Sequence, residues 1–416
     1  MSRQSDEGEV VSNRVIPIVD ASTLKSASNR ASGPRMTSLP PLSLYVHVPW
    51  CVRKCPYCDF NSHQTPETVP EAEFLAALTA DIEQALPLIW GRQVHTVFIG
   101  GGTPSLLSQA AVDQLLGIVR SRLSLWPDAE VTLEANPGTA EAAKFKAYGA
   151  SGVTRISLGI QSFDDDKLKR LGRIHDAREA MQAVEIAQNA VSRVNLDLMY
   201  ALPEQTAEQC RADLERAVSY DTEHLSIYQL TLEPQTVFAK YPPQLPDESQ
   251  IEQMEELINE VVECRGWQRY EVSAYARQGA QCRHNLNYWT FGDYLGVGPG
   301  AHSKISSPDR IIRQARTRNP QQWMQTAASM DGAHIAQEQV LGNDDLPFEF
   351  FLNALRLRGG VALDLFDAHT GMTFADIEPM VSLAQRKGLL TLAKGQIAPT
   401  TLGWRHLNDL QAIFLR

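Results

Sequence analysis

The chain has 416 residues, and its 38 basic and 49 acidic residues give a formal net charge of -11. Its 43% hydrophobic and 21% charged residues are typical of a globular protein, and the length allows two or three domains. The acidic balance argues against binding to nucleic acid, and no apolar run approaches the ~18 residues of a membrane-spanning helix.

Residues 1–38 mix small, polar and charged residues with little periodicity, which predicts a disordered extension, and Met36 is an alternative start of the native chain. Four acidic residues in this stretch argue against a mitochondrial leader, and the pattern of a secretory leader is missing. The six cysteines do not form the framework of a small secreted protein. We therefore expect reduced thiols and a cytoplasmic protein.

From Leu42 onward, short β-rich runs alternate with longer amphipathic stretches. The predicted strands are Leu42–Val48, Val94–Ile99, Glu130–Ala135, Val153–Leu158, Val194–Tyr200 and His224–Leu230. The predicted helices between them include Glu71–Leu86, Gln109–Leu123, Ala177–Ala190 and Ala207–Ser219. This alternation predicts an α/β fold with a parallel sheet, and six units favour a partial, open (β/α)6 barrel over residues 39–305. Its ligands are expected at the C-terminal ends of the strands.

The pattern changes after the barrel. Residues 306–345 are predicted to be a linker, because Asp309–Pro320 is polar and rich in arginine. Residues 346–416 are predicted to form a smaller, helical, winged-helix-like domain. Its expected elements are helices at Phe348–Arg358 and Glu378–Lys387 and a two-stranded wing of Leu389–Ala393 and Gln396–Pro399.

Three cysteines, Cys51, Cys55 and Cys58, lie within eight residues on the loop after the first strand. Thiolates at this spacing can converge on one soft metal centre. Three thiolates suit three irons of a [4Fe–4S] cubane and leave the fourth iron open for the amino and carboxylate groups of S-adenosylmethionine. The alternative is a structural zinc site that uses His63 as its fourth ligand.

An aromatic residue, Tyr57, precedes the third cysteine and favours the cluster. With it, the segment resembles the signature of the radical S-adenosylmethionine superfamily, and the resemblance extends over about residues 40–305. Glycines follow the second strand at Gly100–Gly102, where they expose backbone groups to a ligand. In that superfamily, this stretch binds the methionyl amino group of the cofactor.

Three polar residues lie at or near the ends of consecutive predicted strands: Glu134, Gln161 and Asp197. Burying such groups costs free energy unless they find partners, so they form either a core network or a ligand site. Around one mouth they suit the ribose and amino acid parts of S-adenosylmethionine. Arg173 could bind the carboxylate of the cofactor as a planar fork, or it could form a surface salt bridge.

The segment Tyr45–Cys51 makes the chain similar to oxygen-independent coproporphyrinogen III oxidase and its relatives, which act on the propionate side chains of a porphyrinogen. This resemblance implies that ten residues bind S-adenosylmethionine. They are Tyr45, Gly101, Gly102, Thr103, Glu134, Gln161, Arg173 and Asp197 and, in less similar surroundings, Thr231 and His302.

Two features depart from the oxidase. Phe60 stands where the oxidase carries a fourth cysteine, which puts the decarboxylation in doubt. His284–Trp289 and Gly296–Ser303 resemble the HemW branch of the superfamily, whose members are regarded as heme chaperones. The resemblance implies heme as a ligand, with the imidazole of His284 as a candidate axial ligand. Cys282 is a second candidate, and the alternative is that His284 makes an ordinary hydrogen bond in a turn.

The leading hypothesis is a heme chaperone on a radical S-adenosylmethionine scaffold. It would bind one heme and pass it to an acceptor protein such as a respiratory cytochrome, with at most peripheral contact with the membrane. The cluster and S-adenosylmethionine would control the state of this carrier without coproporphyrinogen oxidation. The competing hypotheses are a true coproporphyrinogen III oxidase and a zinc protein without radical chemistry. The sequence leaves the oligomeric state open.

Overall fold

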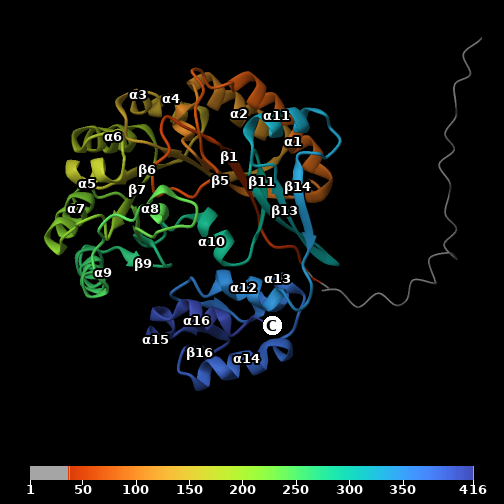
Figure 1. The fold of residues 1–416 in the computed structure, drawn as a ribbon. Coiled ribbons are helices and arrows are strands. Elements are labelled where there is room, and N and C mark those ends of the chain that lie inside the picture. Colours follow the sequence, from red (N-terminus) through yellow and green to blue (C-terminus); the bar gives the residue numbers. More distant parts are fainter. Residues whose placement is uncertain (1–35, 37, 416) are drawn as a thin grey trace, which may run out of the picture. The chain divides into compact units, whose positions relative to one another are not determined.

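The computed structural model describes residues 36 and 38–415 (Figure 1). The predicted disordered extension therefore lies outside the described residues, apart from Met36 and Ser38. A twelve-stranded mixed sheet forms the larger part, in the order β14-β13-β12-β11-β1-β4-β5-β6-β7-β8-β10-β9.

Seven neighbouring strands of this sheet run parallel. They are β1 (Leu42–Val48), β4 (Gln93–Gly101), β5 (Ser124–Ala135), β6 (Arg155–Gln161), β7 (Arg193–Tyr200), β8 (His224–Gln229) and β11 (Asp293–Val297). The six predicted strands are confirmed. The seventh, β11, was not predicted from the sequence, and it pairs with the edge of β1 that faces away from β4. Beyond β8 the sheet continues antiparallel, with β10 (Ala274–Ala276) and β9 (Gln268–Arg269).

Helices cover the outside of the parallel strands (Figure 1). They are α1 (Glu71–Ile89), α2 (Gln109–Arg122), α3 (Thr139–Ala142), α4 (Phe145–Ser151), α5 (Asp165–Arg170), α6 (Ala177–Ala190), α7 (Ala207–Ser219) and α9 (Glu248–Glu263). Two short helices, η2 (Pro104–Leu106) and α8 (Val237–Lys240), lie instead at the C-terminal end of the strands, where the N–H of Phe238 donates to the carbonyl of Pro56. Capping boxes begin α6, α7 and α9, because a side chain and the third helical residue satisfy each other's backbone N–H groups. The apolar faces of strands and helices share one core, to which Leu78, Ile99 and Leu115 belong.

The predicted linker over residues 306–345 is wrong. This stretch contains the end of β12 (His302–Ser307), all of β13 (Arg310–Arg316) and β14 (Ile335–Val340), and the helix α11 (Pro320–Ala328). The three strands extend the sheet antiparallel from β11, and α11 packs against α1. The arginine-rich composition suggested a solvated segment, but Ile311 and Ile312 are buried and Arg316 pairs with an acidic residue of α1.

That acidic residue is Asp81, which is fully buried. One carboxylate oxygen accepts hydrogen bonds from Arg316 Nε at 3.0 Å and His334 Nε2 at 3.1 Å. The other accepts from the backbone N–H of Gly298 at 3.0 Å and from Trp323 Nε1 at 3.2 Å. A buried charge is tolerated only when it is paired and hydrogen-bonded, so Asp81 fixes four separate segments against α1.

The C-terminal part forms a separate helical domain with a small antiparallel sheet. Its elements are α12 (Leu346–Ala354), β15 (Val361–Ala362), α13 (Asp364–Thr370), α14 (Phe374–Arg386), β16 (Leu390–Ala393), β17 (Gln396–Pro399), α15 (Thr401–Arg405) and α16 (Leu407–Ala412). The predicted hairpin is present, and β15 adds a third strand to it. Stacked aromatic rings fill the core, with the centroids of Phe351 and Phe414 3.9 Å apart. Pro379 lies inside α14 rather than in its first turn, because a capping box at Thr373 starts that helix earlier.

Short segments beside the barrel mouth complete the fold. They are β2 (Trp50–Cys51), β3 (His63–Gln64) and α10 (Arg283–Trp289). Across residues 36 and 38–415, none of the helices combines the length and the apolar character needed to cross a bilayer.

Replacing Asp81 by Asn should destabilise the chain, because the charge of Arg316 would stay buried without its partner. We expect a loss of about 3–5 kcal/mol in the free energy of unfolding, measured by urea denaturation. The matched control is Asp128→Asn, since the side chain of Asp128 is 88% exposed and pairs with Arg283 at the surface. Equal urea midpoints for the two variants would contradict the role given to Asp81.

Candidate functional site

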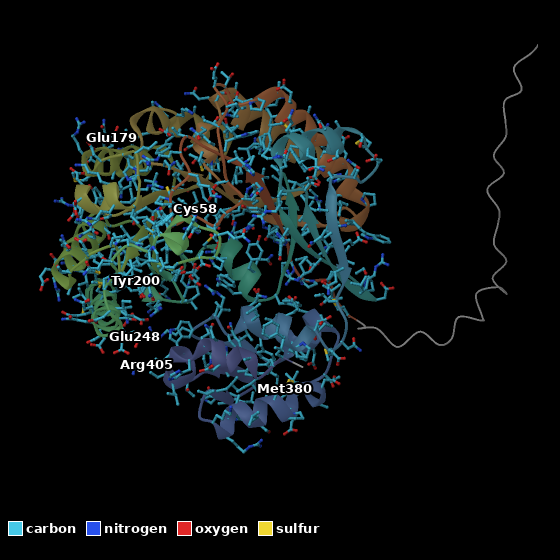
Figure 2. The ribbon with its side chains drawn as sticks, viewed as in Figure 1. Cys58, Glu179, Tyr200, Glu248, Met380 and Arg405 are labelled. Atoms are coloured by element: carbon cyan, nitrogen blue, oxygen red, sulfur yellow. The ribbon has the colours of Figure 1, made fainter. Side chains whose placement is uncertain are left out.

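The three cysteines of the metal motif lie on the loop that follows β1, at the C-terminal end of the parallel strands. Figure 2 labels Cys58 within the barrel. The loop is shaped by its own backbone: the N–H of Cys58 donates to the carbonyl of Cys55 at 3.2 Å, and β2 pairs with β3. All three thiols are half-buried and free.

Each sulfur has a polar neighbour. Thr103 Oγ1 donates to Cys51 Sγ at 3.4 Å, Arg173 Nη1 donates to Cys55 Sγ at 3.6 Å, and Cys58 Sγ lies 3.7 Å from Ser62 Oγ. Burial raises the pKa of Cys51 and of Cys58 above the ordinary thiol value, against the opposing effect of these hydroxyl donors. Thiols of this kind are protonated in the metal-free protein and would release their protons to solvent when they bind a metal centre.

The spacing of these side chains bears on the zinc alternative. Among the residues that the structure describes, no three His, Cys, Asp or Glu side chains converge closely enough to hold a single metal ion. The ring of His63 donates instead to Asn61 Oδ1 at 3.2 Å.

The glycines at the end of β4 allow that strand to approach the cysteine loop. A Cβ on Gly102 would lie 2.5 Å from the carbonyl oxygen of Trp50. Gly101 has φ +114°, and a Cβ there would lie 2.6 Å from the ring of His47. Any side chain at either position would push the strand end away from the loop, so these glycines serve the close packing of the protein itself.

Two predicted carboxylates lie half-buried beside this strand end. Glu134 Oε2 accepts from the backbone N–H of Gly101 at 2.9 Å. Asp197 accepts from Ser157 Oγ at 2.9 Å and Asn195 Nδ2 at 2.8 Å. Burial raises the pKa of Glu134 to about 7, with a further contribution from the charge of Asp197, and burial raises the pKa of Asp197 to about 6. Such a pair favours a cationic ligand.

Arg173 and Gln161 lie near the same mouth. Arg173 Nη2 donates to Asn136 Oδ1 at 2.6 Å and to the carbonyl of Gly159 at 2.9 Å, while its buried Nε has no partner among the described residues. The surface salt bridge considered for Arg173 is therefore not what the structure contains. Gln161 has φ +67°, in the left-handed region, and its Oε1 accepts from Tyr228 at 2.7 Å. This strained backbone aims the amide away from the strand direction.

A cavity of about 460 Å³ opens next to the cysteine loop, on the side of β1, β11 and β12. Four residues predicted to bind S-adenosylmethionine line it: Tyr45, Gly101, Glu134 and His302. The others do not line this cavity: Gly102, Thr103, Gln161, Arg173, Asp197 and Thr231. Thr231 is exposed after β8, and its hydroxyl donates to Glu233 at 2.7 Å.

Two further residues line the cavity and were missed in the sequence, Asn61 and Arg318. Asn61 Nδ2 donates to the carbonyls of Pro299 and Arg318, each at 2.9 Å, so the cysteine loop is tied to the opposite wall. Asn61 follows Cys58 by three residues, and this closeness to the cysteine motif could have indicated that Asn61 belongs to the site. Arg318 follows β13 in the stretch predicted as a linker, and nothing in the local sequence indicated its position.

His284 lies on α10 and is buried. Its Nδ1 makes a 2.8 Å hydrogen bond with Thr96 Oγ1, its ring stacks on Phe98 at 5.0 Å, and its Nε2 has no partner among the described residues. Burial lowers the pKa of His284 to about 3, so the imidazole is neutral. It does not line the cavity. Cys282 is buried against Glu130, and burial raises its pKa to about 12.

Comparison with known proteins identifies the scaffold. The family model of the radical SAM superfamily matches residues 45–217, and that of the HemN C-terminal domain matches residues 341–406. A protein of Escherichia coli strain K12 named heme chaperone HemW is 47% identical over 91% of this chain and 100% of its own length. The chain belongs to the HemW family.

A second HemW relative, from Haemophilus influenzae, is 44% identical over 91% of this chain and 99% of its own length. The solved structure of E. coli coproporphyrinogen III oxidase (HemN), a radical SAM enzyme, matches with a TM-score of 0.77 at 22% identity, over 95% of this chain and 98% of that one. This likeness shows the fold. The predictions of a radical SAM fold and of the HemW branch are confirmed, while the role of each site residue stays a prediction.

The raised pKa of Glu134 predicts that the stability of the folded chain depends on pH. Because the folded-state pKa of about 7 lies above the ordinary value of 4.5, the folded chain keeps a proton that the unfolded chain has released. Stability should therefore fall as the pH rises through this window. In the absence of S-adenosylmethionine, Glu134→Gln should raise the urea midpoint at about pH 8 and reduce its decline from about pH 5.

The matched control for this substitution is Glu83→Gln, because the Glu83 side chain is 40% exposed and pairs with Arg122 at the surface. That variant should keep the wild-type pH profile. Some decline remains expected in Glu134→Gln, since the raised pKa of Asp197 acts in the same direction. A destabilised Glu134→Gln protein with an unchanged pH profile would contradict the burial argument.

Proposed function

We propose that this protein is a heme chaperone that binds one heme and transfers it to an acceptor protein. The observation that carries the proposal is the cavity beside the three cysteines, which is walled in part by the 59% exposed ring of Phe60. An exposed aromatic ring at the place of the oxidase's fourth cysteine suits binding of a flat apolar ligand better than thiol chemistry. Full-length similarity to proteins named heme chaperones supports the same function.

We also propose that Cys51, Cys55 and Cys58 hold a [4Fe–4S] cluster with an exchangeable S-adenosylmethionine. When bound, the cluster supplies a reducing electron to the cofactor. The chain's own residues would hold the cofactor in place: Arg173 with its unpartnered Nε faces the carboxylate, and Glu134 offers negative charge to the amino group. The bonds from Thr103 and Arg173 to the thiols would keep the cysteine loop in position.

The acceptor would be a hemoprotein, and a respiratory cytochrome at the cytoplasmic face of a membrane fits the proposal. The transfer would take place in the cytoplasm with at most peripheral contact with the bilayer. The second candidate function is coproporphyrinogen III oxidation, which the resemblance of the segment Tyr45–Cys51 to that oxidase favours.

The cluster assignment is tested by single substitutions of the cysteines. Cys55→Ala should lose the iron, the acid-labile sulfide and the broad visible absorption of anaerobically reconstituted protein, because three thiolates are the minimum for the cubane. Cys264→Ala is the matched control, since Cys264 is an exposed free cysteine far along the chain. Retention of the full iron content by Cys55→Ala, or bound zinc in place of iron, would refute the cluster.

The chaperone function is tested with heme itself. Cluster-reconstituted protein titrated with hemin should develop a saturable Soret band with one heme per chain, and incubation with a heme-free cytochrome should move the band to the acceptor. Anaerobic incubation with reductant, S-adenosylmethionine and coproporphyrinogen III tests the second candidate. Formation of protoporphyrinogen, or the lack of any saturable heme uptake, would overturn the proposal.

A further inference from the structure

We propose that His302 is the axial ligand of the heme iron and that Arg318 binds a heme propionate, both in the cavity beside the cysteine loop. This assignment rests on the proposed function, since it names the site of the heme that the chaperone carries. It differs from the sequence analysis, which offered His284 and Cys282 as candidate axial ligands and left the choice open.

The cavity has the size of a small-molecule site, and its walls suit a porphyrin. Its volume of about 460 Å³ lies within the range of roughly 300–1,000 Å³ that is usual for small-molecule sites. Aromatic rings of Tyr45, Phe60, Tyr288 and Tyr294 line it. The rings of Tyr288 and Tyr294 lie 4.4 Å apart between centroids, so they form one continuous wall. Flat aromatic surfaces of this kind pack against the face of a macrocycle.

Two imidazoles line this cavity, and among these and the neighbouring His63 and His284 only that of His302 is both accessible and free of side-chain hydrogen bonds to other described residues. His47 accepts a hydrogen bond from Tyr45 and donates one to the carbonyl of Asn61, each at 2.9 Å, so both of its nitrogens are used. His284 is 2% exposed and lies behind the lining residues. His302 is exposed, lines the cavity and makes no hydrogen bond or ion pair with other described residues.

Charge in the cavity favours one position for a propionate. Arg318 is the cation among the lining residues, its side chain is exposed, and it forms no ion pair within the described part of the chain. Asp59 and Glu134 also line the cavity and would repel a carboxylate. A guanidinium binds a carboxylate through two parallel hydrogen bonds, so the propionate is expected at Arg318.

The backbone holds the two proposed ligands close together. β12 begins at His302, and this residue pairs with Ala315 of β13. Just outside the strands, Gly300 N donates to the carbonyl of Thr317 at 3.0 Å. Asn61 then holds both segments through its bonds to the carbonyls of Pro299 and Arg318. Because Asn61 belongs to the cysteine loop, the heme site and the cluster site share one supporting side chain.

The axial ligand is tested by hemin titration of the full-length, cluster-reconstituted protein. His302→Ala should weaken hemin binding by about ten-fold or more and should abolish the histidine-ligation signature in electron paramagnetic resonance and resonance Raman spectra. Added imidazole should restore that signature in His302→Ala. His406→Ala is the matched control, because the side chain of His406 is 56% exposed on the C-terminal domain.

The propionate contact is tested by comparing hemin with hemin dimethyl ester, which lacks free carboxylates. The wild-type protein should prefer hemin, and Arg318→Ala should bind both compounds equally while it keeps the histidine signature. Saturable hemin binding with an unchanged spectrum in His302→Ala, or loss of the histidine signature only in His284→Ala, would overturn this assignment and leave the chaperone function standing. A wild-type protein that takes up no hemin would refute the function as well.

Discussion

The contact between the end of β4 and the cysteine loop is the constraint on which the site depends. The N–H of Gly102 donates to the carbonyl of Val48, and the N–H of Thr103 donates to that of Trp50, each at 2.7 Å. A side chain at Gly102 would meet the Trp50 carbonyl and break this approach. The same glycine turn presents the Gly101 N–H to Glu134 and the Thr103 hydroxyl to Cys51. The glycine turn therefore positions the cysteine loop, the Glu134 carboxylate and the Cys51 thiol relative to one another.

Two carboxylates of the site lose part of their hydration in the folded chain, and a cationic ligand would offset that cost. Glu134 and Asp197 are half-buried, and their raised pKa values mean that their charged forms are poorly compensated by the protein alone. The buried Asp81, by contrast, has four donors and a partner charge. A carboxylate whose hydrogen bonds and charge are fully paired stabilises the scaffold. The carboxylates whose charge is incompletely paired lie where a cofactor is expected.

Local sequence was sufficient where neighbouring residues decide the structure. The alternation of short β-rich runs with longer amphipathic stretches located six of the seven parallel strands, and the predicted helices Ala177–Ala190 and Ala207–Ser219 coincide with α6 and α7 at both ends. The error over residues 306–345 arose because Arg316 was taken as a solvated charge. Its partner Asp81 lies more than two hundred residues earlier in the sequence, so only folding could reveal that this charge is paired.

The sequence by itself determined the HemW-like scaffold and the three cysteines, because a cluster motif is contained within eight consecutive residues of one loop. Only the tertiary structure decided which imidazole faces the cavity. His284 and His302 are equally plausible in a one-dimensional pattern, but packing against Thr96 and Phe98 buries the first and the start of β12 exposes the second. Accessibility depends on long-range packing, which no local spacing encodes.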